Sequence, residues 1–421
     1  MFTAAVAVLW IAGAGAPATA QTRERMTTVA DRRAVSVTIY NNNLALVRDE
    51  RRVALARGSN HLAWRDVTAK IDPTTALFRS LAAPDAVTVG EQNFNYDLLN
   101  PDTVLRSYQG RDVTVVHVNP ATGAQTREPA RILSTEGGVV LRYRDRIETS
   151  VDGRILYPGF PSTLRDRPTL VIDAASRIDR PQELELTYLT GGLSWHADYV
   201  GSLSPSNRLQ LDGLVTLAND SGTAFANARL QLIAGDVNVP APTPAGLQQI
   251  GRVASTANVY QPFSEQAISE YHLYTLGRPT TIADKQTKQV AFLAAHDIPV
   301  TRTLEVRGGG SYRNAQADAG TRVDVANYLT FHNDGGELGI PLPAGTVRIY
   351  QRDADGSTQF VGGDRIGHTP RRETVRLRLG NAFDVTARRR QTDFTHVDTT
   401  HDRSRYEIVV RNAKPVPVRS R

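Results

Sequence analysis

The residues best suited to chemistry in this chain are histidines that stand next to aspartates. His396 and Asp398 are separated by one residue, so on a β-strand they would share a face. An imidazole beside a carboxylate suits Zn²⁺ or Mn²⁺, which makes these two residues candidate metal ligands. His401 and Asp402 follow, but His401 would point to the opposite face unless a turn intervenes. We favour the simpler interpretation, an exposed polar strand and turn.

A second histidine–aspartate pair lies in the sequence WHADY at 195–199. Aromatic and polar groups alternate here, as they do in carbohydrate sites, so Trp195, His196 and Asp198 are candidate ligand-binding residues. On a strand, Trp195 and Tyr199 would face one way, and His196 and Asp198 the other. This division favours a Trp and a Tyr that face the core, with an exposed His–Asp pair.

The standard motifs of enzymes are largely missing. The chain contains no G-x-S-x-G, no phosphate-binding G-x-x-x-x-G-K-[ST], no H-E-x-x-H and no cysteine. The sequence DADG at 353–356 resembles the start of a calcium loop, but it lacks the closing glutamate and suits a hairpin turn of type I′ better. We therefore predict no catalytic residue, no metal and no cofactor.

Strands with a period of two must position these residues. The segment 191–236 contains two alternating strands, a polar corner at Asn219 and a third strand. The corner recurs, because LVTLANDSG at 214–222 matches YLTFHNDGG at 328–336. The sequence therefore predicts an all-β protein built from tandem antiparallel β-sandwich (Ig-like) domains.

Composition shifts along the chain suggest the domain boundaries. Short strands separated by Gly turns between about 98 and 160 indicate a small SH3-like barrel inserted into the first sandwich. A Pro/Ala-rich stretch reads as a linker, followed by a short helix over 263–271 with Ser264 as its N-cap. The expected parts are a signal peptide (1–20), the first sandwich in two pieces (21–97 and 165–238), the inserted barrel (98–164), the linker with its helix (239–280) and a second sandwich (281–421).

The formal net charge is +6, and only four of the 49 basic residues are lysines. Arginines concentrate late in the chain, from Arg371 onward. Such a surface could meet nucleic acid, an anionic glycan or a lipid headgroup. We favour a solvated strand face with interleaved carboxylates, and we expect no nucleic-acid partner, because no recognition helix or aromatic stacking motif accompanies the charge.

The N-terminus has the features of a secretory signal. Residues 2–16 are apolar, and small residues at 17–20 allow cleavage after Ala20, although the first residues carry no Lys or Arg. An uncleaved membrane anchor is the competing interpretation. No other segment is long and apolar enough to span a membrane as a helix. A chain without cysteine suits a periplasmic or secreted bacterial protein.

Several phrases of the sequence resemble a known family. They are YNNNLALVRDERRVAL, LTYLTGGLSWHADYVGSL, LVTLANDSGTAFANARLQLIAGDVN, EYHLYTLGRPTTIADKQTKQVAFL, LGIPLPAGTVRIYQRDADGSTQFVGGDRIGHTP and VRLRLGNAFDVTARRRQTDF. Together they resemble the bacterial proteins that carry the domain of unknown function DUF4139 and, more loosely, the mucoidy inhibitor A family, whose name implies an influence on exopolysaccharide. The coiled-coil segment of the latter is missing here. Family members usually continue past NAKPVPVRSR, so we expect the second sandwich to be C-terminally incomplete. The resemblance implies no catalytic residues.

The sequence thus predicts an exported envelope protein that is not an enzyme and binds a protein or a polysaccharide. Loops at the end of a sandwich or an exposed edge strand would provide the contact surface. The alternative is an envelope hydrolase that depends on a metal or on acid–base catalysis. Its acid–base or metal groups would be His396 with Asp398, or His196 with Asp198.

Overall fold

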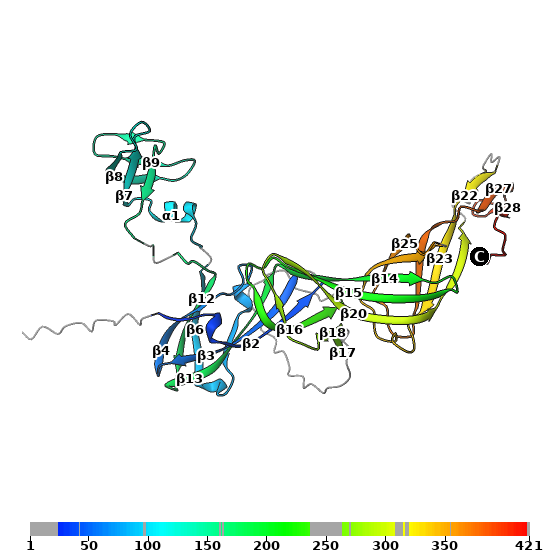
Figure 1. Ribbon diagram of the computed structural model, residues 1–421, viewed down its shortest axis with the longest axis horizontal. Helices are drawn as coiled ribbons and strands as arrows, with labels where there is room; N and C mark the ends of the chain where they lie inside the picture. Colours follow the sequence, from blue (N-terminus) through cyan, green and yellow to red (C-terminus); the bar gives the residue numbers. More distant parts are fainter. Residues whose placement is uncertain are drawn as a thin grey trace, which may run out of the picture. The chain divides into compact units, whose positions relative to one another are not determined.

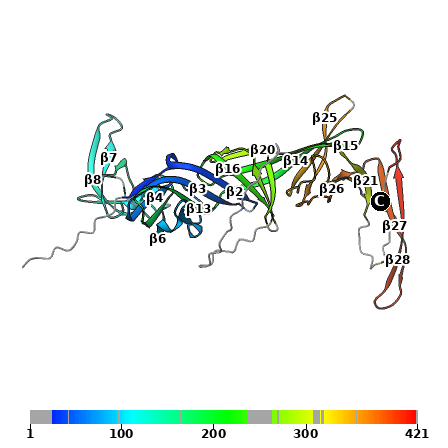
Figure 2. The same ribbon diagram turned by 90° about the horizontal axis from the view of Figure 1, so that it is seen from below.

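A computed structural model describes residues 24–41, 43–95, 98–159, 161, 164–235, 263–268, 271–307, 315, 320–353 and 355–418. The predicted signal peptide and most of the Pro/Ala-rich linker lie outside these ranges. Strands dominate the described residues (Figure 1; Figure 2), which confirms the all-β prediction and fits β-sandwich-type domains. The helical elements are α1 (Pro101–Ser107) and the 3₁₀ turns η1 (Val29–Asp31), η2 (Pro73–Thr75) and η3 (Pro84–Ala86).

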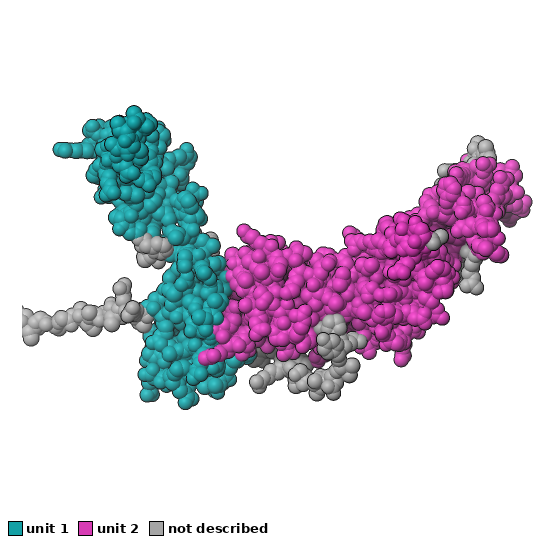
Figure 3. Space-filling model, in the orientation of Figure 1, with its two compact units in different colours: residues 1–31, 51–67, 78–184 teal, residues 32–50, 68–77, 185–421 magenta. Residues whose placement is uncertain are grey.

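The chain divides into two compact units, each built from three stretches of sequence (Figure 3). Unit 1 contains residues 1–31, 51–67 and 78–184, and unit 2 contains residues 32–50, 68–77 and 185–421. Two long strands contribute residues to both units, namely β3 (Leu44–Leu55) and β13 (Arg180–Gly191).

Unit 1 has a four-stranded sheet in the order β1-β4-β12-β6. Its apolar side chains alternate, so that Leu62 and Trp64 of β4 and Leu170 and Ile172 of β12 are fully buried. The strands are β1 (Arg25–Thr27), β4 (Gly58–Arg65), β6 (Val87–Asn95) and β12 (Thr169–Ser176), and β5 (Leu77–Ser80) lies beside β13.

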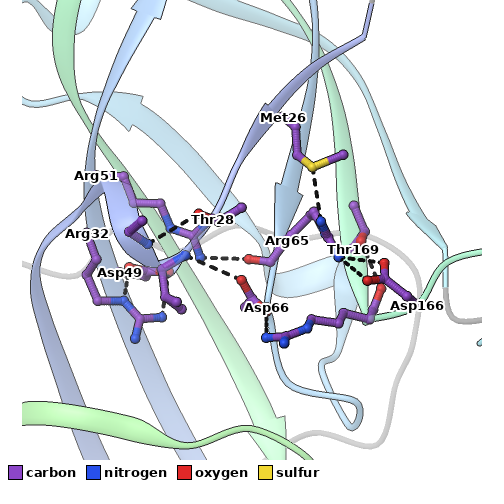
Figure 4. A network of polar contacts seen from close by, with 12 residues as sticks. Met26, Thr28, Arg32, Asp49, Arg51, Arg65, Asp66, Asp166 and Thr169 are labelled. Atoms are coloured by element: carbon purple, nitrogen blue, oxygen red, sulfur yellow. Dashed lines mark hydrogen bonds and ion pairs between the residues drawn. The ribbon is translucent and has the colours of Figure 1, made fainter.

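A buried arginine anchors polar contacts in this unit (Figure 4). Arg51 has its guanidinium 4.5 Å from the centre of the Trp64 ring and donates from Nη2 to the carbonyl oxygen of Arg65 at 2.7 Å. The neighbouring Asp66 accepts from Nη1 of Arg167 at 2.8 Å. Such contacts compensate for the removal of a charged group from water.

The inserted region of unit 1 is a five-stranded sheet in the open order β10-β9-β8-β7-β11. The predicted SH3-like barrel is wrong in this respect, because β10 and β11 do not pair in the described residues. These edge strands are only two and three residues long, which leaves too few backbone groups to close a barrel. The strands are β7 (Asp112–Val118), β8 (Gln125–Ser134), β9 (Val140–Arg142), β10 (Ile147–Glu148) and β11 (Arg154–Leu156).

The insertion has its own small core and its own helix. Ile132, Leu141 and Tyr143 belong to a cluster of buried side chains inside it. The helix α1 begins with a capping box, in which the Asn100 side chain accepts from the backbone N–H of Thr103 at 2.9 Å. The sequence analysis missed this helix, although Asn followed by Pro and Thr is a recognisable start signal.

Unit 2 begins with a mixed sheet in which β17-β18-β16-β2-β3-β13 are successive neighbours. The short helix predicted over 263–271 is wrong: this region forms two antiparallel strands. Phe263 pairs with Leu276, and both side chains are buried, so core packing overrides the local helix signal. The strands are β2 (Arg32–Tyr40), β16 (Phe225–Ala234), β17 (Phe263–Ile268), β18 (Tyr271–Leu276) and β19 (Thr280–Ile282), which pairs with β16.

A second sheet of unit 2 has the order β20-β15-β14-β24-β25. The predicted hairpin around 353–356 is confirmed, because β24 and β25 pair antiparallel on either side of it. The pairing of β14 with β24 is parallel, as are those of β1 with β4 and β2 with β16, so the sheets are not purely antiparallel as predicted. The strands are β14 (Leu193–Leu203), β15 (Arg208–Asn219), β20 (Gln286–Pro299), β24 (Gly345–Arg352) and β25 (Thr358–Ile366).

Two three-stranded sheets complete unit 2, in the orders β21-β23-β26 and β22-β27-β28. They share a core in which Leu304 and Val325 pack with Val385 and Ala387. Figure 2 shows β27 and β28 as a long hairpin. The strands are β21 (Thr301–Val306), β22 (Thr321–Val323), β23 (Val325–His332), β26 (Thr374–Asn381), β27 (Val385–His396) and β28 (Asp402–Asn412).

The repeated corner seen in the sequence has the same role at both places. Asn219, at the end of β15, is buried, and its Nδ2 donates to the carbonyl oxygens of Thr223 at 2.9 Å and Ala283 at 3.0 Å. Asn333, just after β23, is also buried, and its Nδ2 donates to the carbonyl oxygens of Ile340 at 2.8 Å and Pro370 at 2.9 Å. Each amide therefore holds a loop against the end of a strand.

In the part of the chain that the structure describes, no helix has the length and apolar character needed to cross a membrane.

Candidate functional site

The outward face of the sheet β20-β15-β14-β24-β25 carries the histidine–aspartate pair of β14. The predicted alternation is confirmed for the aromatic residues, because Trp195 and Tyr199 are buried. Trp195 is therefore no part of a surface site, and its Nε1 donates to the carbonyl oxygen of Ile233 at 3.3 Å. His196 faces solvent with 63% of its side chain exposed. Asp198 departs from the prediction, since only 9% of the residue is exposed.

Three neighbours cover the Asp198 carboxylate. Its Oδ1 accepts from Nη1 of Arg348 at 3.0 Å, and its Oδ2 accepts from Oγ1 of Thr216 at 2.9 Å. Nε2 of His196 lies 3.1 Å from the same Oδ2. Because both oxygens are engaged, the carboxylate has one fixed orientation.

The network continues across the sheet to β20. Nε2 of Gln289 donates to Oγ1 of Thr216 at 3.1 Å, and the register places Thr216 opposite both His196 and Gln289. Five side chains from four adjacent strands are thus aligned on one surface. We call them the polar face: His196, Asp198, Thr216, Gln289 and Arg348.

Two aromatic rings lie beside the polar face. Tyr350 follows Arg348 by two positions on β24 and therefore points the same way. Its ring meets that of Phe360 on β25, with the ring centres 5.5 Å apart and the planes at 61°. Phe360 is 60% exposed, which leaves an apolar surface available next to Arg348.

Two opposing effects act on the pKa of Asp198. Burial raises it, whereas hydrogen bonds from Arg348 and then Thr216, together with the charge of His196, lower it, and the result is a pKa below the ordinary value. The carboxylate is therefore ionised at neutral pH. It serves as a fixed acceptor and is poorly suited to act as a proton donor.

The candidate metal ligands His396 and Asp398 do not share a strand face, which agrees with the favoured interpretation of a polar strand and turn. The strand β27 ends at His396, so Asp398 lies in the turn that follows and does not share its face. His396 instead pairs through Nδ1 with Asp402 across the hairpin, and Nδ1 of His401 lies 2.9 Å from Asp398. The described residues contain no group of three or more His, Cys, Asp and Glu side chains arranged to hold a metal ion.

Unit 1 contains a cluster of charged side chains around His61 that the sequence analysis did not identify. Nδ1 of His61 on β4 lies 2.5 Å from Asp173 on β12, and Nε2 lies 3.6 Å from Glu24. Arg165 donates two hydrogen bonds to Glu24, at 2.8 and 2.6 Å, which lower the pKa of that carboxyl against the effect of burial. These residues are spread over positions 24–173, so no local sequence pattern predicts that they meet. Their mutual pairing gives them a structural role in this unit.

No protein-family model and no curated protein matches this chain. The resemblance to the DUF4139 proteins stays a prediction.

Proposed function

We propose that this protein is exported to the bacterial envelope, is not an enzyme, and binds a polysaccharide through the polar face and the adjoining Tyr350–Phe360 pair. The observation that carries the proposal is the Asp198 carboxylate, held by Arg348 and Thr216 on an open sheet surface. Groups fixed in this way need little reordering when a ligand binds, so less of the binding free energy is lost.

The chemistry of the surface supports a sugar ligand. Arg348 keeps 45% of its side chain exposed, and His196 keeps 63%. Their remaining N–H groups, with the exposed Gln289 amide, can bond neighbouring hydroxyls, while Asp198 holds Arg348 in place. The exposed Phe360 ring offers a flat apolar surface on which the C–H face of a sugar can pack.

The same surface is less suited to a protein partner. The centre of a protein–protein interface is usually depleted of charged residues and rich in buried apolar contacts. Here the charged residues occupy the centre, and the aromatic pair stands at one side.

The test is a binding screen of the purified protein on a glycan array and on isolated peptidoglycan. We expect binding of at least one glycan, with Arg348→Ala and Phe360→Ala each weakening it by about tenfold or more. Arg229→Ala, on an exposed position of β16, should leave binding unchanged. Each variant must melt cooperatively before its binding is interpreted.

Two results would contradict the proposal. One is glycan binding that survives the loss of both Arg348 and Phe360. The other is turnover of any envelope polymer, which would favour the hydrolase. Export is tested separately, by fractionation and N-terminal sequencing for cleavage after Ala20.

A further inference from the structure

The sheet β22-β27-β28 places two arginines directly opposite each other. Arg322 of β22 is the cross-strand partner of Arg388 on β27, and both are exposed. The opposite face of the sheet, with Val385 and Ala387, packs against the core. Arg322 and Arg388 therefore point together into solvent.

Two further arginines share this face. Arg390 follows Arg388 by two positions, and Arg411 of β28 lies opposite Thr386, which is two positions before Arg388. We call Arg322, Arg388, Arg390 and Arg411 the arginine face.

The charge of this face is only partly balanced. Arg390 donates to Glu407 at 3.0 Å on the facing strand. Among the described residues, Arg322, Arg388 and Arg411 form no ion pair with a carboxylate. The aspartate that follows β22, Asp324, accepts a hydrogen bond from Asn381 at 3.0 Å.

Like charges directly opposite each other on neighbouring strands destabilise a sheet. The arrangement costs less when an anion lies between the guanidinium groups. A guanidinium binds a carboxylate through two parallel N–H groups, which makes arginine better suited than lysine to this task. The surface therefore has the composition of an anion site.

We propose that the arginine face binds a linear anionic polysaccharide. Neighbouring strands lie about 4.8 Å apart, and alternate residues along a strand lie about 6.8 Å apart, so the four arginine side chains leave one face of the sheet at neighbouring positions. Several positive charges at such a spacing suit an extended polymer with regularly repeated anionic groups. This inference does not rest on the polar face, which belongs to a different sheet.

The test measures binding of polygalacturonate, dextran sulfate and neutral dextran to the full chain, at about 50 and about 200 mM salt. We expect binding of the two acidic polymers, weaker at the higher salt, and none of neutral dextran. The double variant Arg388→Gln/Arg411→Gln should lose affinity by about tenfold or more. A charge-matched control, Arg229→Gln/Arg278→Gln, replaces two exposed arginines elsewhere in unit 2 and should lose less than about twofold.

The variants also separate binding from folding. Because Arg388→Gln removes the repulsion with Arg322, we expect its melting temperature to equal or exceed that of the parent protein. Arg388→Lys/Arg411→Lys keeps the charge and should retain the salt dependence with reduced affinity. An equal loss in the control pair, or no binding of acidic polymers, overturns the proposal. So does binding of phosphatidylglycerol vesicles or DNA in their place. Arg348→Ala changes the polar face and leaves the arginine face intact. This variant should therefore still bind the acidic polymers, even where it loses the glycan of the proposed function.

Discussion

The Asp198 carboxylate accepts a hydrogen bond from Nη1 of Arg348 at 3.0 Å across 150 positions of sequence. Asp198 lies on β14 and Arg348 on β24, and these strands pair in parallel. The register places Arg348 opposite Val200, so its side chain reaches diagonally to the carboxylate. The candidate glycan site depends on this one strand pairing.

The coupling between Asp198 and Arg348 can be measured with a double-mutant cycle. Asp198→Asn, Arg348→Met and the combination should give a coupling free energy of about 0.5–1 kcal/mol, because Arg348 is almost half exposed and water screens the pair. Urea unfolding of the four proteins provides the values. A coupling free energy of zero would mean that the pair does not hold in solution.

Stability should fall in acid because of the same carboxylate. The pKa of Asp198 in the folded protein lies below its ordinary value of 3.8, so the ionised form stabilises the fold. This contribution is complete above the unfolded pKa and is lost as the pH falls through the folded pKa. The difference in unfolding free energy between the parent protein and Asp198→Asn should therefore be present at about pH 5, above both pKa values of the carboxyl group, and should shrink below about pH 4. A difference that grows in acid would contradict the assignment.

The two corner asparagines should be among the most sensitive polar residues of unit 2. Asn219→Ala and Asn333→Ala each remove a buried amide and leave two partly buried backbone carbonyls without their donor, and we expect each to lower the free energy of unfolding by about 1–3 kcal/mol. Asp220→Ala and Asp334→Ala, at the exposed next positions, are the matched controls and should change it by less than about 0.5 kcal/mol. Thermal and urea unfolding compare the four. Equal effects of asparagine and aspartate variants would rule out the proposed role of the amides.

The pairing of β14 with β24 requires a glycine at position 345. A Cβ there would lie 2.3 Å from the carbonyl oxygen of Ala197, which belongs to the backbone and has little freedom to move. Gly345→Ala should therefore destabilise the protein by about 1–3 kcal/mol and weaken glycan binding through displacement of Arg348. Gly367→Ala serves as control, since a Cβ there meets nothing within 4 Å. A Gly345→Ala protein as stable as the control would show that β24 pairs less closely with β14.

Much of the fold could be predicted from local patterns. The alternation of β14 predicted that Trp195 and Tyr199 are buried, because the two faces of a strand differ at every second residue. The helix predicted over 263–271 was wrong. It was expected because Ser264 followed by polar residues resembles the start of a helix. Only the pairing of Phe263 with Leu276 and their shared burial make this segment a strand.

The candidate site could be predicted only in part. His196 and Asp198 stand two positions apart, so their proximity follows from the period of a strand. Arg348, Thr216 and Gln289 show no signal that distinguishes them from other polar strand residues. For His396 and Asp398, the favoured interpretation of an exposed polar strand and turn agrees with the structure, because the strand ends at His396 and the weaker metal candidate needed both residues on one strand.

The sequence by itself determined the all-β architecture, the alternation that buries Trp195 and exposes His196, and the repeated corner at Asn219 and Asn333. These properties depend on neighbouring residues and on the period of the strand. Only the tertiary structure decided which strands lie side by side, that β14 and β24 run parallel, and that Arg348 reaches Asp198 and Arg322 faces Arg388. Pairing and register result from contacts between distant parts of the chain, and a shift of one residue would turn every one of these side chains to the other face.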